Sequence, residues 1–174
     1  MLRDMEFALP TFAYHPDPVS TGSIVRAADA CACCGEARGF IYSGPTYAVE
    51  QIEFICPWCI ADGSAARESG LEFGTVDGEP GEVPPTVLDE IVRRTPGFAG
   101  WQQERWLFHC SDGAEFHGRV GYQDVVGVPG VIEWIVADGW HRDVLPDMSA
   151  DGELAGYLFR CRHCSAYLAY ADCS

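Results

Sequence analysis

Basic residues are scarce in this chain of 174 residues. Its 11 Lys and Arg side chains face 26 Asp and Glu side chains, which leaves a formal net charge of −15. A surface of this sign repels the phosphate backbone of nucleic acids, and it also disfavours contact with anionic membrane surfaces. The charge therefore argues against nucleic-acid binding and favours a basic protein as partner.

Long apolar runs are also missing. The longest, Phe54 to Ala61, has eight residues and contains a proline, whereas a membrane span needs roughly 20 apolar residues. The first residues include Asp4 and Glu6, where a signal peptide has a basic region followed by an apolar run. We therefore expect a soluble, cytoplasmic protein.

The composition still supports a folded core, because apolar residues make up 48% and charged residues 21% of the chain. Alternating apolar residues and turn signals predict strands over 9–14, 39–42, 106–110, 157–161 and 167–171. Helices are predicted over 58–67 and from 86 to a stop at 95–97, with one more turn at 101–105. We expect an α+β fold in which small zinc-ribbon-like β-hairpins accompany a few short helices.

One stretch of the chain has the composition of a linker. Residues 74–85 are acidic and rich in Gly and Pro, which is typical of a surface loop. The loop divides a predicted single domain, 1–174, into a Cys-rich lobe, 1–73, and a second lobe, 86–174. The length of the chain suits one domain or two small lobes that share a core.

Cysteine is abundant, with nine residues, six of which fall in Cys-x-x-Cys pairs. Without an export signal, an odd number of cysteines in such pairs indicates metal or redox chemistry rather than disulfides. Zinc takes four ligands at tetrahedral corners, and two Cys-x-x-Cys turns supply them. The strongest prediction is therefore a zinc ion held by Cys31, Cys34, Cys56 and Cys59.

Two features of this first site leave alternatives open. Cys33 could replace Cys31 or Cys34, although the latter two have the usual spacing. The segment 56–59, at the start of a predicted helix, also resembles a redox dithiol whose first thiol is acidified by the helix dipole. A redox dithiol needs no second Cys-x-x-Cys pair, so the upstream pair favours zinc. Buried cysteines without a metal are the remaining alternative.

A second zinc site is predicted at the hairpin between the last two strands, where the ligands would be Cys161, Cys164 and Cys110. The fourth position could be filled by water or by one of four side chains, which are His109, Asp112, His117 and His163. His163 is expected to face solvent, and strand alternation is expected to turn His109 away from Cys110. Asp112 and His117 then remain. Cys173 is expected to play no part.

The number of protein ligands at this second site decides between two functions. Four would make the zinc structural, whereas three plus a water would permit metal-assisted hydrolysis. In the second case Asp112 and Glu115 could assist the metal-bound water. Their simpler interpretation is a polar turn at a strand end.

Several other residues have both a functional and a structural interpretation, and the structural one is favoured for most. His15 and Asp17 could form an acid–base pair, or a turn with His15 packed beneath it. The segment 21–23 could bind an anion through backbone N–H groups. Five tryptophans, at 58, 101, 106, 134 and 140, could line a pocket but more often pack a core. The segment 102–105 could anchor the two lobes or contact a ligand.

Motifs along nearly the whole chain resemble the CbrC family. They include Leu9-Pro10-Thr11-Phe12, Tyr14-His15-Pro16-Asp17-Pro18, Gly39-Phe40-Ile41-Tyr42-Ser43-Gly44-Pro45, Cys56-Pro57-Trp58-Cys59-Ile60-Ala61-Asp62-Gly63, Arg94-Thr95-Pro96-Gly97-Phe98 and Phe159-Arg160-Cys161-Arg162-His163-Cys164. The resemblance implies a bacterial, largely uncharacterised protein that is associated with colicin tolerance. It implies no reaction and no catalytic residues.

Three functions are consistent with these observations. The first is a protein-interaction module in which zinc replaces part of the core and the acidic surface meets a basic protein. The second is a zinc-dependent hydrolase with an open metal site at Cys110, Cys161 and Cys164. The third is a redox sensor whose thiols release zinc when they are oxidised.

Overall fold

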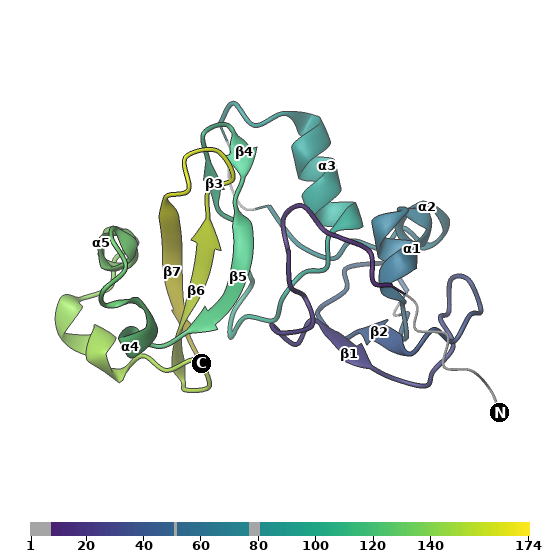
Figure 1. Cartoon of the computed structure of the whole chain (residues 1–174), viewed down its shortest axis with the longest axis horizontal. Coiled ribbons are helices and arrows are strands. Elements are labelled where there is room, and N and C mark those ends of the chain that lie inside the picture. Colours follow the sequence, from purple (N-terminus) through teal and green to yellow (C-terminus); the bar gives the residue numbers. More distant parts are fainter. Residues whose placement is uncertain (1–7, 51, 77–80) are drawn as a thin grey trace.

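The computed structural model of the chain describes residues 8–50, 52–76 and 81–174 (Figure 1). None of the helices in these ranges is long and apolar enough to cross a lipid bilayer. The elements, in chain order, are β1 (Ile24–Arg26), β2 (Phe40–Tyr42), α1 (Pro57–Ala61), α2 (Ser64–Ser69), α3 (Pro85–Arg94), β3 (Phe108–His109), β4 (Asp112–Gly113), β5 (Glu115–Val120), α4 (Tyr122–Val125), α5 (Val131–Ala137), the 3₁₀ helix η1 (Arg142–Asp147), β6 (Leu154–Arg160) and β7 (Tyr167–Cys173).

The first half of the chain forms a short hairpin and two short helices. β1 and β2 pair antiparallel, with Ile24 opposite Tyr42. α1 begins at Pro57, since the fixed φ of proline suits the first helical position. The single helix predicted over 58–67 is instead divided into α1 and α2, because Gly63 adopts a left-handed φ of 74°. The division shortens α1 to the turn that carries Cys59.

Helix α3 lies between the two ends of the molecule and contacts both α1 and β4 (Figure 1). It starts directly after Pro84, and Ile91 on its inner face is fully buried. It ends at Thr95, whose backbone is extended, because a following proline disfavours the helical conformation. The predicted helix and its stop are therefore present, and the helix begins one residue earlier than predicted.

The second half of the chain is built around the antiparallel sheet β5-β6-β7. The two strands predicted at 157–161 and 167–171 are present as β6 and β7, paired from Leu154 with Cys173 to Arg160 with Tyr167. β5 joins β6 with an irregular register between Phe116 and Gly118. Helices α4 and α5 lie at the β7 side of this sheet (Figure 1).

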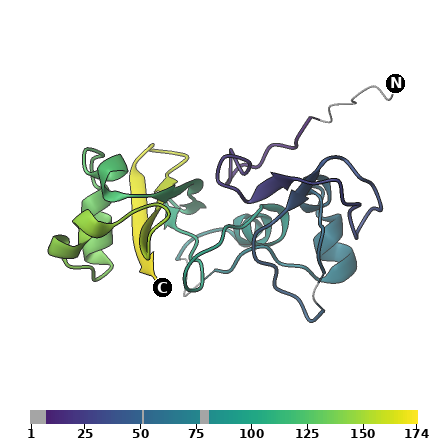
Figure 2. The ribbon, with the colours of Figure 1, turned by 90° about the horizontal axis from the view of Figure 1, so that it is seen from below.

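The buried apolar side chains form three clusters. The first contains residues 12 to 73 only and surrounds β1, β2, α1 and α2. The second joins α3 to the inner face of the sheet, where the Phe98 and Phe116 rings stack with centroids 3.8 Å apart. The third packs α4, α5 and η1 against β7. Figure 2 shows the segments that surround the first cluster, β1 to α2, and the sheet β5-β6-β7 at opposite ends of the molecule.

Two predicted elements are absent from the described residues. Residues 9–14 form no strand, although Phe12 and Tyr14 are both buried. No helical turn forms at 101–105, because its backbone donors bind the sheet instead. The Gln102 N–H donates to Asp172 Oδ2 at 2.7 Å, and the Arg105 N–H donates to the Tyr170 hydroxyl at 3.3 Å.

The expected fold class is confirmed. The structure is mixed α+β, with small antiparallel sheets, a few short helices and cysteine clusters compatible with zinc-ribbon-like motifs. The division into lobes at 74–85 stays a prediction. Tyr14 precedes the proposed boundary but packs in the second cluster.

Candidate metal centres

The first predicted pair of cysteines lies in a tight turn before β2. The Gly35 N–H donates to the Cys31 carbonyl at 2.8 Å, and the Cys31 N–H donates to the Glu36 carbonyl at 3.0 Å. Gly35 has a φ of 74°, a left-handed conformation that glycine adopts without a Cβ penalty. The turn therefore points Cys31 and Cys34 toward the start of α1.

The second pair begins α1. Cys56 is the residue before the helix, and the Cys59 N–H donates to its carbonyl at 3.1 Å, which completes the first turn. The Cys56 N–H itself donates to the Cys31 sulfur at 3.2 Å. The free N–H groups of a helix start stabilise thiolates, as they do other anions.

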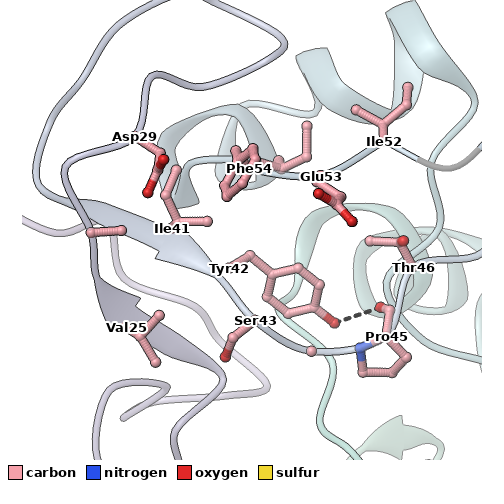
Figure 3. A pocket seen from close by; sticks show the side chains of 13 residues that line it. Val25, Asp29, Ile41, Tyr42, Ser43, Pro45, Thr46, Ile52, Glu53 and Phe54 are labelled. Carbon is pink, nitrogen blue, oxygen red and sulfur yellow. Dashed lines mark hydrogen bonds between the residues drawn. The ribbon is translucent and has the colours of Figure 1, made fainter.

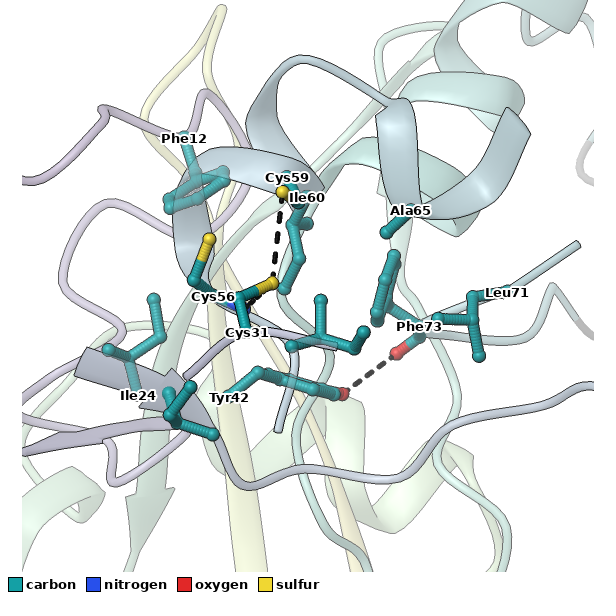
Figure 4. Packing of buried hydrophobic residues seen from close by; sticks show 12 residues of the cluster. Phe12, Ile24, Cys31, Tyr42, Cys56, Cys59, Ile60, Ala65, Leu71 and Phe73 are labelled. Carbon is teal, nitrogen blue, oxygen red and sulfur yellow. Dashed lines mark hydrogen bonds between the residues drawn. The ribbon is translucent and has the colours of Figure 1, made fainter. Parts of the chain in front are cut away.

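The four sulfurs of these pairs converge, and all lie within 4.8 Å of one another. Cys31 Sγ is 3.8 Å from Cys59 Sγ, and Cys34 Sγ is 3.8 Å from Cys56 Sγ (the first contact is drawn in Figure 4). Sulfurs at the corners of a zinc tetrahedron are about 3.8 Å apart. All four cysteines are free thiols, and Cys31, Cys56 and Cys59 are buried. The geometry and the donor chemistry of this cluster therefore fit zinc.

The electrostatics of the cluster are those of thiols crowded together. Burial opposes ionisation of Cys31, but backbone N–H groups of the two turns outweigh it and lower the pKa of this thiol to about 7. Burial raises the pKa of Cys56 to about 11, and burial also raises the pKa of Cys59. The Cys31 thiol therefore ionises readily, whereas Cys56 and Cys59 ionise less readily than free thiols. A bound cation would favour the thiolate form of all of them.

Cys33 lies outside this cluster. Its sulfur is 3.6 Å from Ser64 Oγ and 3.8 Å from Glu68 Oε2, both on α2. The alternative in which Cys33 takes the place of Cys31 or Cys34 therefore has no geometric support.

The hairpin between β6 and β7 repeats the first turn. The Ser165 N–H donates to the Cys161 carbonyl at 3.0 Å, and the Cys161 N–H donates to the Ala166 carbonyl at 2.8 Å. Ser165 has a φ of 61°, as Gly35 does at the matching position. The structure brings Cys161 and Cys164 together with Cys110.

The fourth donor of this second cluster is His109, and its predicted orientation away from Cys110 was wrong. Its Nδ1 lies 3.3 Å from Cys110 Sγ and 3.4 Å from Cys164 Sγ, near the spacing of about 3.6 Å for a nitrogen and a sulfur on one zinc. Cys110 and Ser111 both have left-handed φ values, 52° and 56°. The chain turns there, so the alternation of a strand does not apply.

Neither remaining candidate for the fourth position reaches the cluster. Asp112 accepts hydrogen bonds from the Tyr14 hydroxyl at 2.8 Å and Arg162 at 3.0 Å, and lies 2.9 Å from His163 Nε2. His117 pairs with Glu115 at 3.3 Å. Asp112 thus holds the turn that carries Cys161 and Cys164 through Arg162 and His163, and neither Asp112 nor Glu115 belongs to the cluster.

The second cluster is more open than the first, since Cys110 and Cys164 are exposed. Burial opposes ionisation of Cys161, but the N–H groups of Cys164 and His163 lower the pKa of this thiol to about 6. Desolvation and the two neighbouring thiols raise the pKa of Cys110 to about 11. Three sulfurs and one imidazole nitrogen fit zinc, as in the Cys₃His class of structural sites.

The other candidates from the sequence have structural partners. His15 is fully buried, 2.7 Å from both the Pro96 carbonyl and Thr21 Oγ1. Asp17 caps a turn by accepting from the Ser20 N–H at 3.1 Å. Of the five tryptophans, Trp106 is buried, whereas Trp101 and Trp134 are exposed. Cys173 lies on β7, outside both clusters.

The segment 102–105, for which anchoring of the two lobes was one interpretation, contains a carboxyl group whose burial the sequence did not reveal. Glu104 is 3% exposed, and both of its carboxylate oxygens lie 2.7 Å from the Tyr47 hydroxyl. Burial raises the pKa of Glu104. The pair joins segments 57 positions apart in the sequence, so no local pattern could have revealed it.

Comparison with known proteins gives a family but no activity. The family model that matches, over residues 9–173, is UPF0167, described as an uncharacterised protein family. The chain is 44% identical to UPF0167 protein Mb2317 of Mycobacterium bovis and to UPF0167 protein MT2352 of Mycobacterium tuberculosis, over 94% of this chain and 93% of each relative. It is 38% identical to UPF0167 protein PA1536 of Pseudomonas aeruginosa, over 90% of this chain and 92% of that one.

No solved structure matches the chain significantly. The family expected from the motifs is corrected by these findings, since both the family model and the curated relatives point to UPF0167 and not to CbrC. The match to the family model spans nearly the whole chain. The protein therefore belongs to the UPF0167 family.

Proposed function

We propose that the protein binds two structural zinc ions and serves as a protein-interaction module. The observation that carries this proposal is the complete set of four donors in each cluster, Cys₄ in the first and Cys₃His in the second. Soft thiolates with tetrahedral spacing favour zinc over magnesium, calcium or manganese, which prefer oxygen ligands.

The position of His109 weighs against the hydrolase alternative. A catalytic zinc keeps one position open for water or substrate. With His109 beside Cys110 and Cys164, the second cluster has four protein donors. An open metal site at Cys110, Cys161 and Cys164 therefore has no support from the geometry.

A redox role at the second cluster is favoured by one specific observation, the exposure of Cys110 and Cys164. Peroxide could take two electrons from this pair, so that an S–S bond forms, the peroxide is reduced to water and the zinc is released. Stoichiometric release by mild peroxide, reversed by a thiol reductant, would support this second candidate. Retention of zinc under the same treatment would remove it.

The charge and the free thiols support the rest of the proposal. A net charge of −15 favours a basic protein as partner and disfavours nucleic acid and anionic membrane surfaces. All nine cysteines are free thiols, which suits a reducing compartment such as the cytoplasm. In this role the zinc ions hold the fold and perform no chemistry.

The metal content of the untagged protein tests this proposal. We expect two zinc ions per chain, and one in a Cys110→Ser variant. A Cys173→Ser variant, altered on β7 outside both clusters, is the matched control and should keep two. One zinc in the unaltered chain that persists in Cys110→Ser would remove the second site, and the absence of zinc would overturn the proposal.

A further inference from the structure

A surface pocket lies beside the first cysteine cluster. It has a volume of about 550 Å³ and is walled by the β1–β2 hairpin, the loop 43–46 and the segment 52–55 (Figure 3). The last of these segments leads directly into Cys56. The loop wall is held in part by the Tyr42 hydroxyl, which donates to the Pro45 carbonyl at 2.7 Å.

The charge of this pocket has one sign. Asp29 and Glu53 are the charged residues that line it, and the described lining includes no basic side chain. Neither carboxylate has a hydrogen-bond or ion-pair partner among the described residues, unlike Glu72, Asp89 and Glu90, which all pair with arginines. Two unpaired carboxylates at one concave site attract a cation, because concave walls focus the field.

The rest of the wall is apolar and partly exposed. Val25 is 40% and Phe54 47% exposed, and Figure 3 shows the Phe54 ring between the Asp29 and Glu53 side chains in that view. Phe54 has a φ of 60°, a conformation that bulky residues rarely adopt. The backbone is held there from both sides, since the Phe54 carbonyl accepts from Ala32 N–H at 3.0 Å and the Ile55 carbonyl from Tyr42 N–H at 2.8 Å.

We propose that this pocket binds an arginine or lysine side chain of a partner protein. This inference rests on the proposed function, because it assigns the place where a basic partner meets the module. The carboxylates of Asp29 and Glu53 would neutralise the cation, the apolar wall would cover its aliphatic stem, and the Phe54 ring offers a face for a cation–π contact. Arginine fits best, since its planar group stacks on rings and binds carboxylates with two hydrogen bonds.

The pocket and the first cluster are built from the same stretch of chain. Ala32, between Cys31 and Cys34, holds the Phe54 carbonyl, and Ile55 precedes Cys56. A metal at the four cysteines therefore also holds one wall of the pocket. This connection gives the predicted interaction site a dependence on zinc.

The probe that tests the proposal is a capped peptide, acetyl-Gly-Leu-Arg-Leu-Gly-amide, with a second peptide that carries neutral citrulline in place of arginine. Binding is measured by calorimetry at low salt. The test variant combines Asp29→Asn with Glu53→Gln. The control combines Asp151→Asn with Glu153→Gln, which removes the same charge at exposed residues far along the chain.

The expected result is that the arginine peptide binds and the citrulline peptide binds at least tenfold more weakly. The pocket variant should lose about tenfold in affinity, since an exposed charge pair contributes up to about 1 kcal/mol and two pairs are removed. The control variant should lose less than twofold. Equal losses in both variants would mean that net charge alone attracts the peptide, and would overturn the proposal.

A second variant, Phe54→Ala, keeps both carboxylates and removes the ring. It should weaken the arginine peptide several-fold, and unchanged affinity would remove the ring from the site. Free n-propylguanidine, a monocation that carries the same guanidinium without a peptide, should bind more weakly than the peptide. Tighter binding of n-propylguanidine would contradict a protein partner and point to a small guanidinium compound.

Metal content is determined on the same samples, so that two failures can be told apart. A protein with two zinc ions that does not bind the arginine peptide overturns the pocket and leaves the structural-zinc proposal standing. A protein without zinc that still shows the pocket-dependent binding overturns the zinc proposal and the dependence of the pocket on zinc, and leaves the pocket itself standing.

Discussion

At the scale of single residues, His109 has the largest consequence, because a fourth protein donor at the second cluster leaves no open position for a metal-bound water. Strand alternation predicted that it points away from Cys110, and two left-handed residues, Cys110 and Ser111, turn it inward. A backbone conformation of this kind has no reliable signature in non-glycine residues. The sequence therefore offered His109 among four candidates for the fourth position, but strand alternation wrongly set it aside.

Removal of this donor should weaken metal binding at the second cluster only. We expect His109→Ala to release one zinc ion to a competing chelator at least tenfold more readily, because a tetrahedral site has lost one of its four ligands. His117→Ala is the control, since His117 contacts Glu115 and not the cluster. Equal retention of zinc in both variants would show that His109 is no ligand.

His15 should make the stability of the fold depend on pH. Burial lowers its pKa from 6.5 to about 4. The unfolded chain therefore binds a proton at this histidine below about pH 6.5, whereas the folded chain binds it only below about pH 4. The free energy of unfolding should therefore fall as the pH decreases from about 6.5 to about 4, by up to about 3 kcal/mol from this group.

The measurement compares urea unfolding of the unaltered chain and a His15→Gln variant at pH 7 and pH 5. Both proteins share the cysteine clusters, so the difference between them isolates the histidine. The variant should show the smaller loss of stability at pH 5. A His15 imidazole that is protonated at pH 5.5 by NMR would contradict this prediction.

At the scale of elements, the two cysteine turns are the same structure built twice. Each has a hydrogen bond from the fifth residue to the first carbonyl, and each places a left-handed residue there, Gly35 in one and Ser165 in the other. The Cys-x-x-Cys spacing predicted both turns. It did not predict that one tolerates serine where glycine is the unstrained choice.

Exchanging serine and glycine at the fifth position should therefore change the stability of the two turns in opposite directions. Ser165→Gly should stabilise the protein by about 1 kcal/mol, because it relieves a Cβ in a left-handed conformation, and Gly35→Ser should destabilise it by about as much. Thermal unfolding of the metal-loaded proteins checks both. A lower melting temperature for Ser165→Gly would contradict the prediction.

The two elements that were predicted but are absent from the described residues share a physical cause. The segment 101–105 has residues suited to a helical turn, but its N–H groups donate to Asp172 and Tyr170 of the sheet. Residues 9–14 alternate like a strand, yet Phe12 and Tyr14 enter different cores. In both segments distant partners outweigh local preference.

At the scale of the whole molecule, the two clusters differ in how deeply they are built into the fold. Cys31, Cys56 and Cys59 are members of the first core, whereas Cys110 and Cys164 are exposed on a hairpin and a turn. If a metal is bound as we propose, its loss from the first cluster would leave three buried thiols without a metal ion. Loss at the second exposes its outer thiols to water.

The two clusters should therefore contribute unequally to stability. We expect Cys56→Ser to lower the free energy of unfolding by several kcal/mol, on the scale of a structural zinc site, and Cys164→Ser to lower it by much less. Chemical unfolding of both variants under reducing conditions provides the comparison. An equal loss, or a larger one for Cys164→Ser, would contradict the difference in burial.

The sequence by itself determined the fold class, the strands β6 and β7, the helix α3 and seven cysteines that meet in two groups. These features depend on local periodicity, proline and glycine signals and fixed spacing, which act over a few residues. Only the tertiary structure decided the fourth donor of the second cluster, the burial of Glu104 against Tyr47 and the pocket at Asp29 and Glu53. Each of these requires contacts between distant segments or an unusual backbone conformation, and neither leaves a local pattern in the sequence.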